Sequence, residues 1–206
     1  MIKDDHKLPE LPEVETIIRR LRDGTHDHPP VLGHKIQSVE IKWERIIAKP
    51  EPEAFKRGLI GKTITDARRR AKYLHFPLDE GHLVGHLRMS GDMRMMRRLD
   101  PKGAPIAKEK YDQVIINFES NWRMTFSSIR KFGRMWYTRD LDSIFGALGP
   151  EPLSEDFTAE VLYEIIHAHS RQLKPLLLDQ HIIAGLGNVY TDESLFKAGI
   201  HPLRRS

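Results

Sequence analysis

The chain has no cysteine among its 206 residues, which excludes disulfide bonds and metal sites built from thiolates. It also has no apolar run as long as a bilayer span, and residues 1–8 contain no hydrophobic core of a signal peptide. Internal repeats and low-complexity segments are absent as well. These absences predict a protein of the reducing cytoplasm with no membrane partner.

Positive charge is in slight excess, with 33 Lys and Arg against 29 Asp and Glu. The excess is uneven along the chain, because residues 68–72 contain three arginines and a lysine. Clustered cations favour a polyanionic partner, although solvated surface charge is an equally simple interpretation.

The spacing of apolar residues predicts an α+β fold. Residues 12–21 have helical spacing, with Pro12 in the first turn and Gly24 beyond the end. Five later segments alternate apolar with polar residues and are predicted strands. They contain Val39, Ile41 and Trp43; Leu74, Phe76 and Leu78; Leu83, Leu87 and Met89; Val114, Ile116 and Phe118; and Trp122, Met124 and Phe126. Turn signals at residues 79–81 and 119–121 predict hairpins, and therefore an antiparallel β-sandwich flanked by helices.

The pattern changes at residues 148–153, which read Leu-Gly-Pro-Glu-Pro-Leu. Helical spacing follows around residues 161–166 and 173–179, and again from Asn188 to Gly199. We therefore predict an extension over residues 1–8, a β-rich domain over 9–147, a linker over 148–153 and a partial helical domain over 154–206.

Five short segments occur in a distinctive order. Residues 9–16 read Pro-Glu-Leu-Pro-Glu-Val-Glu-Thr, and residues 69–74 read Arg-Arg-Ala-Lys-Tyr-Leu. His-Leu-Arg-Met-Ser-Gly follows at 86–91, Arg-Lys-Phe-Gly at 130–133 and Gly-Leu-Gly-Asn at 185–188. Together they closely resemble the formamidopyrimidine-DNA glycosylase family, in its oxidised-purine branch, over nearly the whole chain from Pro9. The resemblance implies a catalytic β-sandwich followed by part of a helix-two-turn-helix domain.

The resemblance also implies a DNA glycosylase with abasic-site lyase activity, which removes 8-oxoguanine and formamidopyrimidines through a Schiff base. Pro9 would attack as a free secondary amine, and Glu10 would act as an acid toward the sugar oxygen. Lys72 would contact phosphate and assist proton transfer. Glu13 and His86 are expected to support this site.

The other residues that the resemblance implies contact DNA. The expected partner is double-stranded DNA that contains oxidised bases or abasic sites, and the protein is expected to bind it as a monomer. Enzymes that act on a base take it out of the stack, so other groups must fill the gap. The side chains expected to fill the gap are Met89, Arg130 and Phe132. The residues expected to contact phosphate are Tyr111, Lys174 and Asn188. Tyr111 stands where the family often has histidine, and Ser128 where it has aspartate.

Each of these residues also has a purely structural interpretation. Lys72 could be a solvated charge, Asn188 a helix N-cap, and Met89 and Phe132 core residues of strands. His82 and His86 have the spacing of a metal pair but lack a third ligand. No cofactor is expected in this chain, because the zinc that the family usually binds belongs to a four-cysteine finger that this sequence does not contain.

Pro9 is internal in this sequence, and an amide nitrogen is almost without nucleophilicity because its lone pair is delocalised. The Schiff-base chemistry therefore requires that Pro9 becomes the N-terminus. One hypothesis is that translation starts at Leu8 from an alternative start codon, and that removal of the resulting methionine exposes Pro9. The alternatives that stay open are a catalytically inactive damaged-DNA-binding remnant and an inert gene fragment of the same family.

Overall fold

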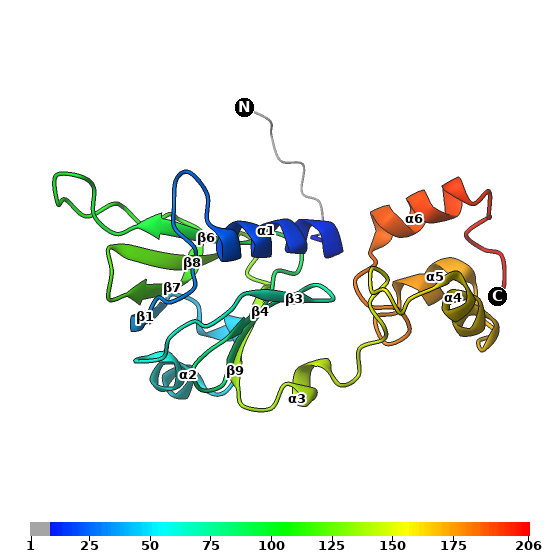
Figure 1. Ribbon diagram of the computed structural model, residues 1–206, viewed down its shortest axis with the longest axis horizontal. Helices are drawn as coiled ribbons and strands as arrows, with labels where there is room; N and C mark the ends of the chain where they lie inside the picture. Colours follow the sequence, from blue (N-terminus) through cyan, green and yellow to red (C-terminus); the bar gives the residue numbers. More distant parts are fainter. Residues whose placement is uncertain (1–8) are drawn as a thin grey trace. The chain divides into compact units, whose positions relative to one another are not determined.

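A computed structural model describes residues 9–206 of the chain (Figure 1). The predicted extension over residues 1–8, which includes Leu8, lies outside the described residues. The chain divides into two compact units. One holds the chain up to Arg69 together with Tyr73–Leu141, and the other holds Arg70–Lys72 with Asp142–Ser206. The predicted α+β class is confirmed, since the elements are a mixture of helices and mostly antiparallel strands.

Helix α1 (Leu11–Asp23) follows Pro9 almost directly. Its apolar residues recur at helical spacing, so that Val14, Ile18 and Leu21 form one buried stripe. Gly24 ends the helix with a φ of 76°, a conformation that favours glycine. The buried stripe packs α1 on β6 and β4, and this packing fixes the position of the residues just before the helix.

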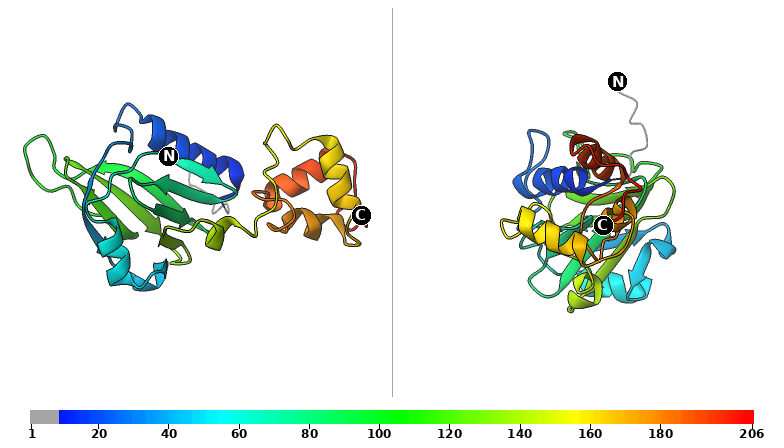
Figure 2. Two further views of the ribbon diagram at one scale, coloured as in Figure 1. Left: turned by 60° about the horizontal axis from the view of Figure 1, so that its bottom comes forward. Right: turned by 90° about the vertical axis from the view of Figure 1, so that its right-hand side faces the viewer.

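The strands form two sheets (Figures 1 and 2). The four-stranded sheet has the order β1 (Ile36–Ile41), β7 (Asp112–Phe118), β8 (Trp122–Ser128) and β6 (Gly91–Arg97), and every pair in it is antiparallel. The five-stranded sheet has the order β2 (Ile47–Lys49), β9 (Arg134–Thr138), β5 (His82–His86), β4 (Tyr73–Pro77) and β3 (Arg68–Arg70). Strands β2 and β9 are parallel, which differs from the fully antiparallel arrangement predicted from the hairpins.

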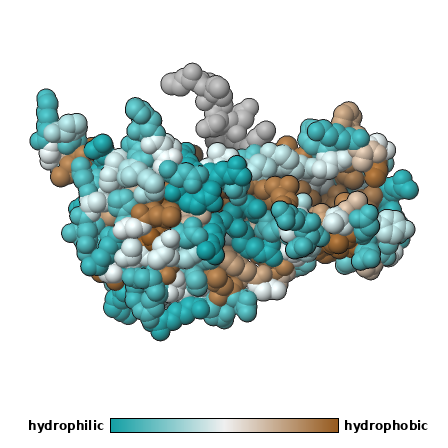
Figure 3. All heavy atoms as spheres, viewed as in Figure 1, coloured by the Kyte–Doolittle hydropathy of each residue, from teal (hydrophilic) through white to brown (hydrophobic). Residues whose placement is uncertain are grey.

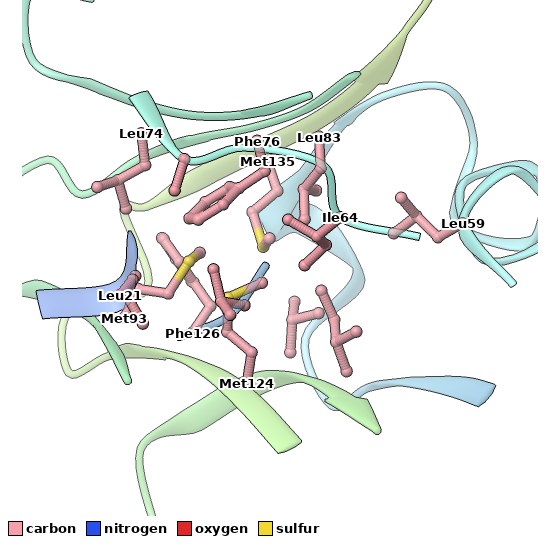
Figure 4. Close-up of a cluster of buried hydrophobic side chains, with 14 of the residues drawn as sticks. Leu21, Leu59, Ile64, Leu74, Phe76, Leu83, Met93, Met124, Phe126 and Met135 are labelled. Carbon is pink, nitrogen blue, oxygen red and sulfur yellow. The ribbon is translucent and has the colours of Figure 1, made fainter. Parts of the chain in front are cut away.

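The core of the first unit lies between the two sheets (Figure 4). Side chains from both sheets and from α1 meet there, among them Leu21, Phe76, Met93 and Phe126. Helix α2 (Pro52–Leu59) adds Phe55 and Leu59 from the side of β1, β2 and β9. Burying one such side chain contributes roughly 1.5–3 kcal/mol, so this core fixes the sheets firmly.

Three strand predictions are wrong in their extent. Strand β1 ends at Ile41, and Trp43 precedes the short 3-10 helix η1 (Glu44–Ile46). Strand β5 ends at His86, so Met89 lies in a turn. Strand β4 ends at Pro77, and Leu78 forms only an isolated bridge with Ile64. In each case the apolar alternation continues beyond the end of the strand.

The second unit is helical, with α3 (Asp142–Phe145), α4 (Ala159–His167), α5 (Leu173–Leu178) and α6 (Asn188–Lys197). Thr158 caps α4 by accepting a hydrogen bond from the Val161 N–H, 3.3 Å away. Leu173, Leu176 and Leu195 belong to a separate apolar cluster of this unit. Apolar side chains of the three longer helices line a groove of about 260 Å³. Figure 3 shows hydrophobic residues, in brown, on the surface of this unit.

Strands β4 and β5 hold a histidine pair, of which His75 is buried and His82 half-buried. His75 Nε2 and His82 Nδ1 are 3.1 Å apart, and His75 is only 7% exposed. Burial is the main cause that lowers the pKa of His75 from 6.5 to about 4, and repulsion from Arg68, and from His82 once it is protonated, adds to the effect. The pKa of His82 is lowered in the same way, first by burial and then by Arg68, so both rings are neutral at pH 7.

We expect the protein to lose stability between pH 6.5 and pH 4. The unfolded chain takes up a proton on His75 near pH 6.5, whereas the folded chain does so only near pH 4, so acid favours unfolding. The loss from this residue is about 3 kcal/mol over the interval. Urea denaturation at a series of pH values measures it, and His75→Gln is the control that should flatten the curve. An equally steep pH dependence in both proteins would contradict this expectation.

Candidate functional site

The strand register brings several chain segments to one edge of the four-stranded sheet, namely the side on which these strands begin or end. Ile41 pairs with Val114, Asp112 pairs with Ser127, and Gly91 pairs with Ser128. The end of β1, the start of β7, the end of β8 and the start of β6 therefore lie together. Two connections leave from this edge: the β5–β6 turn (residues 87–90) and the β8–β9 loop (residues 129–133).

These two connections contact each other through predicted gap-filling residues. The Arg130 backbone N–H donates to Ser90 Oγ over 3.3 Å, and the Arg130 guanidinium lies 3.7 Å from Met89 Sδ. Phe132, in the same loop as Arg130, is 52% exposed, and Met89 is half-buried. The interpretation of Phe132 as a core residue is therefore wrong, because its ring lies at the surface.

Tight local packing shapes the β5–β6 turn. The Gly91 N–H donates to the Leu87 carbonyl over 3.1 Å, and a Cβ on Gly91 would lie only 2.6 Å from that oxygen. Only glycine fits such a close backbone approach. Arg88 has a φ of 57°, and its N–H donates to His86 Nδ1 over 3.1 Å. His86, whose ring packs edge-on against Tyr73 at 4.6 Å, thus supports the turn that carries Met89.

The β8–β9 loop is held mainly by Ser128, which is 1% exposed. Its N–H donates to the Tyr111 carbonyl over 3.0 Å, and its carbonyl accepts from Gln113 Nε2 over 3.3 Å. Its hydroxyl accepts from the Gly133 N–H over 3.4 Å and so closes the loop. The Tyr111 side chain is 40% exposed, with the Lys110 ammonium 5.5 Å from its ring. The sequence alone did not identify Gln113 as a loop anchor.

Pro9 and Glu10 lie immediately before α1. Glu10 is the N-cap residue and is 2% exposed, and it forms a capping box with Glu13. The Glu10 N–H donates to Glu13 Oε2 over 3.0 Å, so Glu13 holds the backbone of the residue that follows Pro9. Glu15 pairs with Arg69 at 3.0 Å; burial opposes its ionisation, but hydrogen bonds from Arg19 and Arg69 outweigh burial and lower the pKa of Glu15.

Lys72 belongs to the second unit, whereas Pro9 and Glu10 belong to the first. Lys72 follows Ala71, which is buried. Ala71 has a φ of 50°, in the left-handed region that residues other than glycine rarely adopt. Glu151 accepts hydrogen bonds from the Ala71 N–H and from Arg70, the latter over 2.9 Å. Glu151 thus stabilises the turn that carries Lys72, a role that sequence reasoning missed.

In the helical unit, Asn188 is the first residue of α6 and is exposed. Gly187 is the N-cap, so the interpretation of Asn188 as the cap itself is wrong. Lys174, on α5, forms an ion pair with Asp192 of α6 at 2.8 Å. Gln180, which sequence reasoning also missed, shapes the loop before α6: it donates to the Leu178 and Leu186 carbonyls and accepts from the Gly185 N–H, each over 2.9 Å.

Residues 9–206 contain no group of three or more histidine, aspartate or glutamate side chains that could hold a metal ion. Over the same residues, no helix is both long enough and apolar enough to cross a bilayer.

The described chain thus has two parts, a β-rich unit in which two loops meet and a helical unit. One family model matches each part. The model of the formamidopyrimidine-DNA glycosylase N-terminal domain matches residues 8–135, and that of the formamidopyrimidine-DNA glycosylase H2TH domain matches residues 148–206. The chain belongs to the formamidopyrimidine-DNA glycosylase family, as the sequence motifs predicted.

Individual relatives agree with this assignment. The formamidopyrimidine-DNA glycosylase of Brevibacillus brevis is 43% identical over 200 residues, which are 95% of this chain and 68% of that protein. That of Protochlamydia amoebophila is 40% identical over 197 residues, 95% of this chain and 67% of that protein. The structure of the Lactococcus lactis protein with DNA containing N7-benzyl-Fapy-dG matches with a TM-score of 0.82 and 37% identity, over 96% of this chain and 70% of that one. A complex of the same protein with abasic-site DNA matches with a TM-score of 0.82 and 36% identity, over 96% of this chain and 69% of that one.

Proposed function

We propose that this protein is a base-excision-repair DNA glycosylase with abasic-site lyase activity, which removes oxidised purines once Pro9 is its N-terminal residue. The observation that carries the proposal is the contact between Arg130 and Met89 at the sheet edge, with Phe132 exposed beside it. Met89 is far from Arg130 and Phe132 in the sequence, and the strand register brings their two loops together.

This arrangement suits an enzyme that extrudes a nucleotide from a duplex. Extrusion leaves a gap in the stack and an unpaired base on the opposite strand. A thioether, a planar guanidinium and an aromatic ring can fill the gap, pair with the unpaired base and separate neighbouring base pairs. An aromatic side chain that is 52% exposed at such an edge is consistent with a ring that is covered only when DNA is bound.

The catalytic groups follow from the position of Pro9. As a free secondary amine, Pro9 would attack the sugar carbon that carries the damaged base, and its lone pair would form the new bond as the base departs. The attached nitrogen would then lose its proton, which balances the proton that the departing base takes up. Glu10, next to Pro9 in the chain, would protonate the sugar oxygen so that the ring opens to an iminium. The iminium permits strand scission by elimination. Glu13 would hold the Glu10 backbone in place, as its 3.0 Å hydrogen bond indicates.

The DNA backbone would be bound by groups of both units. Tyr111 lies at the sheet edge, while Lys174 and Asn188 lie on the helical unit, with Asn188 in the first turn of α6, where backbone N–H groups favour phosphate. Lys72 would contact phosphate and assist proton transfer. The partner is double-stranded DNA with oxidised bases or abasic sites, bound by a monomer. The relatives named above are bacterial proteins, so the site of action would be the bacterial cytoplasm.

The proposal is tested with a protein that begins at Pro9 and with duplexes that carry one lesion each. We expect strand cleavage at 8-oxoguanine to be at least about tenfold faster than at an oxidised pyrimidine, which a difference of about 1.4 kcal/mol in barrier would produce. Undamaged duplex serves as the control and should stay intact. Equal or faster cleavage at the pyrimidine lesion would contradict the assignment to oxidised purines.

A further inference from the structure

Trp43 is in contact with the β8–β9 loop, although none of the motifs includes it. Its ring packs partly on the core of the first unit, directly after β1. The Lys131 ammonium lies 4.2 Å from the centre of that ring, within the range of a cation–π interaction. The Arg45 guanidinium lies farther away, at 5.7 Å. Trp43 therefore holds one loop cation closely and a neighbouring cation only weakly.

Lys131 has a special place in the loop because it stands between Arg130 and Phe132. Its φ is 59°, a left-handed conformation that costs a residue with a side chain about 1 kcal/mol or more. The backbone contact that could fix this conformation, from the Lys131 N–H to the Ser128 carbonyl, is long at 3.3 Å. The side-chain contact with Trp43 thus supplies a restraint that the loop backbone lacks.

Trp43 is itself well anchored. The Lys42 N–H donates to the Gln113 carbonyl over 2.8 Å, and the Gln113 side chain donates to the Ser128 carbonyl over 3.3 Å. The residue before Trp43 and the base of the β8–β9 loop are thus bound to the same residue of β7. A ring fixed at this point can hold the Lys131 side chain relative to the sheet.

We infer that Trp43 is a positioning residue, which acts through Lys131 to hold Arg130 and Phe132 in the orientation that gap filling requires. The inference rests on the proposed function and adds to it a residue outside the family motifs. Trp43 itself does not contact the DNA. It restricts the β8–β9 loop before DNA binds, so that less conformational entropy is lost when the loop enters the duplex.

The test is a double-mutant cycle on the full chain with Trp43→Leu and Lys131→Met. The probe is a duplex with a tetrahydrofuran abasic-site analogue, and the measured quantity is its affinity relative to that of undamaged duplex. We expect each single variant to lower this selectivity about two- to fivefold, which is the effect of one exposed cation–π contact. The selectivity of the double variant should be no lower than that of the less selective single variant, because both substitutions remove the same contact. Additive losses, or a Trp43→Leu protein with unchanged selectivity, would overturn the inference.

Two further variants separate positioning from a general structural effect. Trp43→Phe should keep most of the selectivity because a phenyl face still attracts the ammonium, whereas Arg45→Met should leave it unchanged. A Trp43→Phe protein as defective as Trp43→Leu would also overturn the inference. If Trp43→Leu does not fold, tryptophan fluorescence tests the contact between Lys131 and Trp43 instead. Lys131→Met should change the tryptophan emission of the otherwise unchanged chain. The same substitution should leave the emission of the Trp43→Phe protein unchanged.

Failure of the inference can be distinguished from failure of the proposed function. Equal affinity of the unchanged chain for damaged and undamaged duplexes would contradict the proposed function. The emission measurement needs no DNA, and it would still show whether Lys131 lies on the Trp43 ring.

Discussion

A protein that begins at Pro9 will be captured covalently on 8-oxoguanine DNA by borohydride, whereas the 206-residue chain will not. The reason is the state of one nitrogen atom. In the longer chain it belongs to an amide, and its lone pair is delocalised into the carbonyl of the preceding residue. As a free secondary amine it can attack the sugar and form an iminium, which borohydride reduces to a stable amine.

The measurement is denaturing electrophoresis of labelled DNA after reduction. The matched control retains a single residue before Pro9, so that the fold is the same and only the amine is blocked. We expect a shifted band with the Pro9 form and none with the control. Equal capture by both forms would contradict the role of Pro9. Damage-selective binding by both forms without any capture would instead favour the non-catalytic binding remnant.

Glu10→Gln, made in the Pro9 form, will lose base removal while keeping DNA binding. Glu10 is only 2% exposed and lies next to Pro9 in the chain, and in the proposed mechanism its carboxyl group delivers a proton to the reacting sugar. Glutamine keeps the size and the N-capping oxygen but cannot donate an acidic proton. We expect single-turnover base release to fall about 10²- to 10⁴-fold, the usual contribution of a general acid.

Glu13→Gln is the matched control for Glu10. Glu13 accepts the Glu10 N–H over 3.0 Å and has no assigned step in the chemistry. Glutamine keeps the accepting oxygen and loses only the charge near the helix N-terminus, so we expect this variant to lose less than about 1 kcal/mol of stability and less than about tenfold in rate. A Glu10→Gln protein that reacts as fast as the unchanged Pro9 form would show that the acid is another group.

The sequence predicted the family and most strands, but it did not predict where the strands end. Alternating apolar residues indicate which face of a strand meets the core, and the backbone pairing that ends a strand has no such periodic signal. For this reason Met89 was placed on a strand although it lies in a turn closed by Gly91. The same limit applies to Trp43, which continues the alternation past the end of β1.

The supporting residues of the site were harder to predict than the motif residues. Glu151 and Gln180 act through hydrogen bonds to backbone groups in loops, and no repeating pattern marks such positions. The contact between Trp43 and Lys131 joins distant parts of the chain, so only the folded sheet brings them together. Capping was also hard to predict, because the sequence permits Asn188 as the N-cap of α6 whereas the cap is Gly187.

The most direct test of the central claim is to map where the DNA is attached in the borohydride-reduced complex of the Pro9 form. Trypsin digestion and tandem mass spectrometry would identify the modified peptide and atom. We expect a modification on the α-nitrogen of Pro9, in the peptide that ends at Arg19. A modification on a lysine side chain, such as that of Lys72 or Lys131, would contradict it.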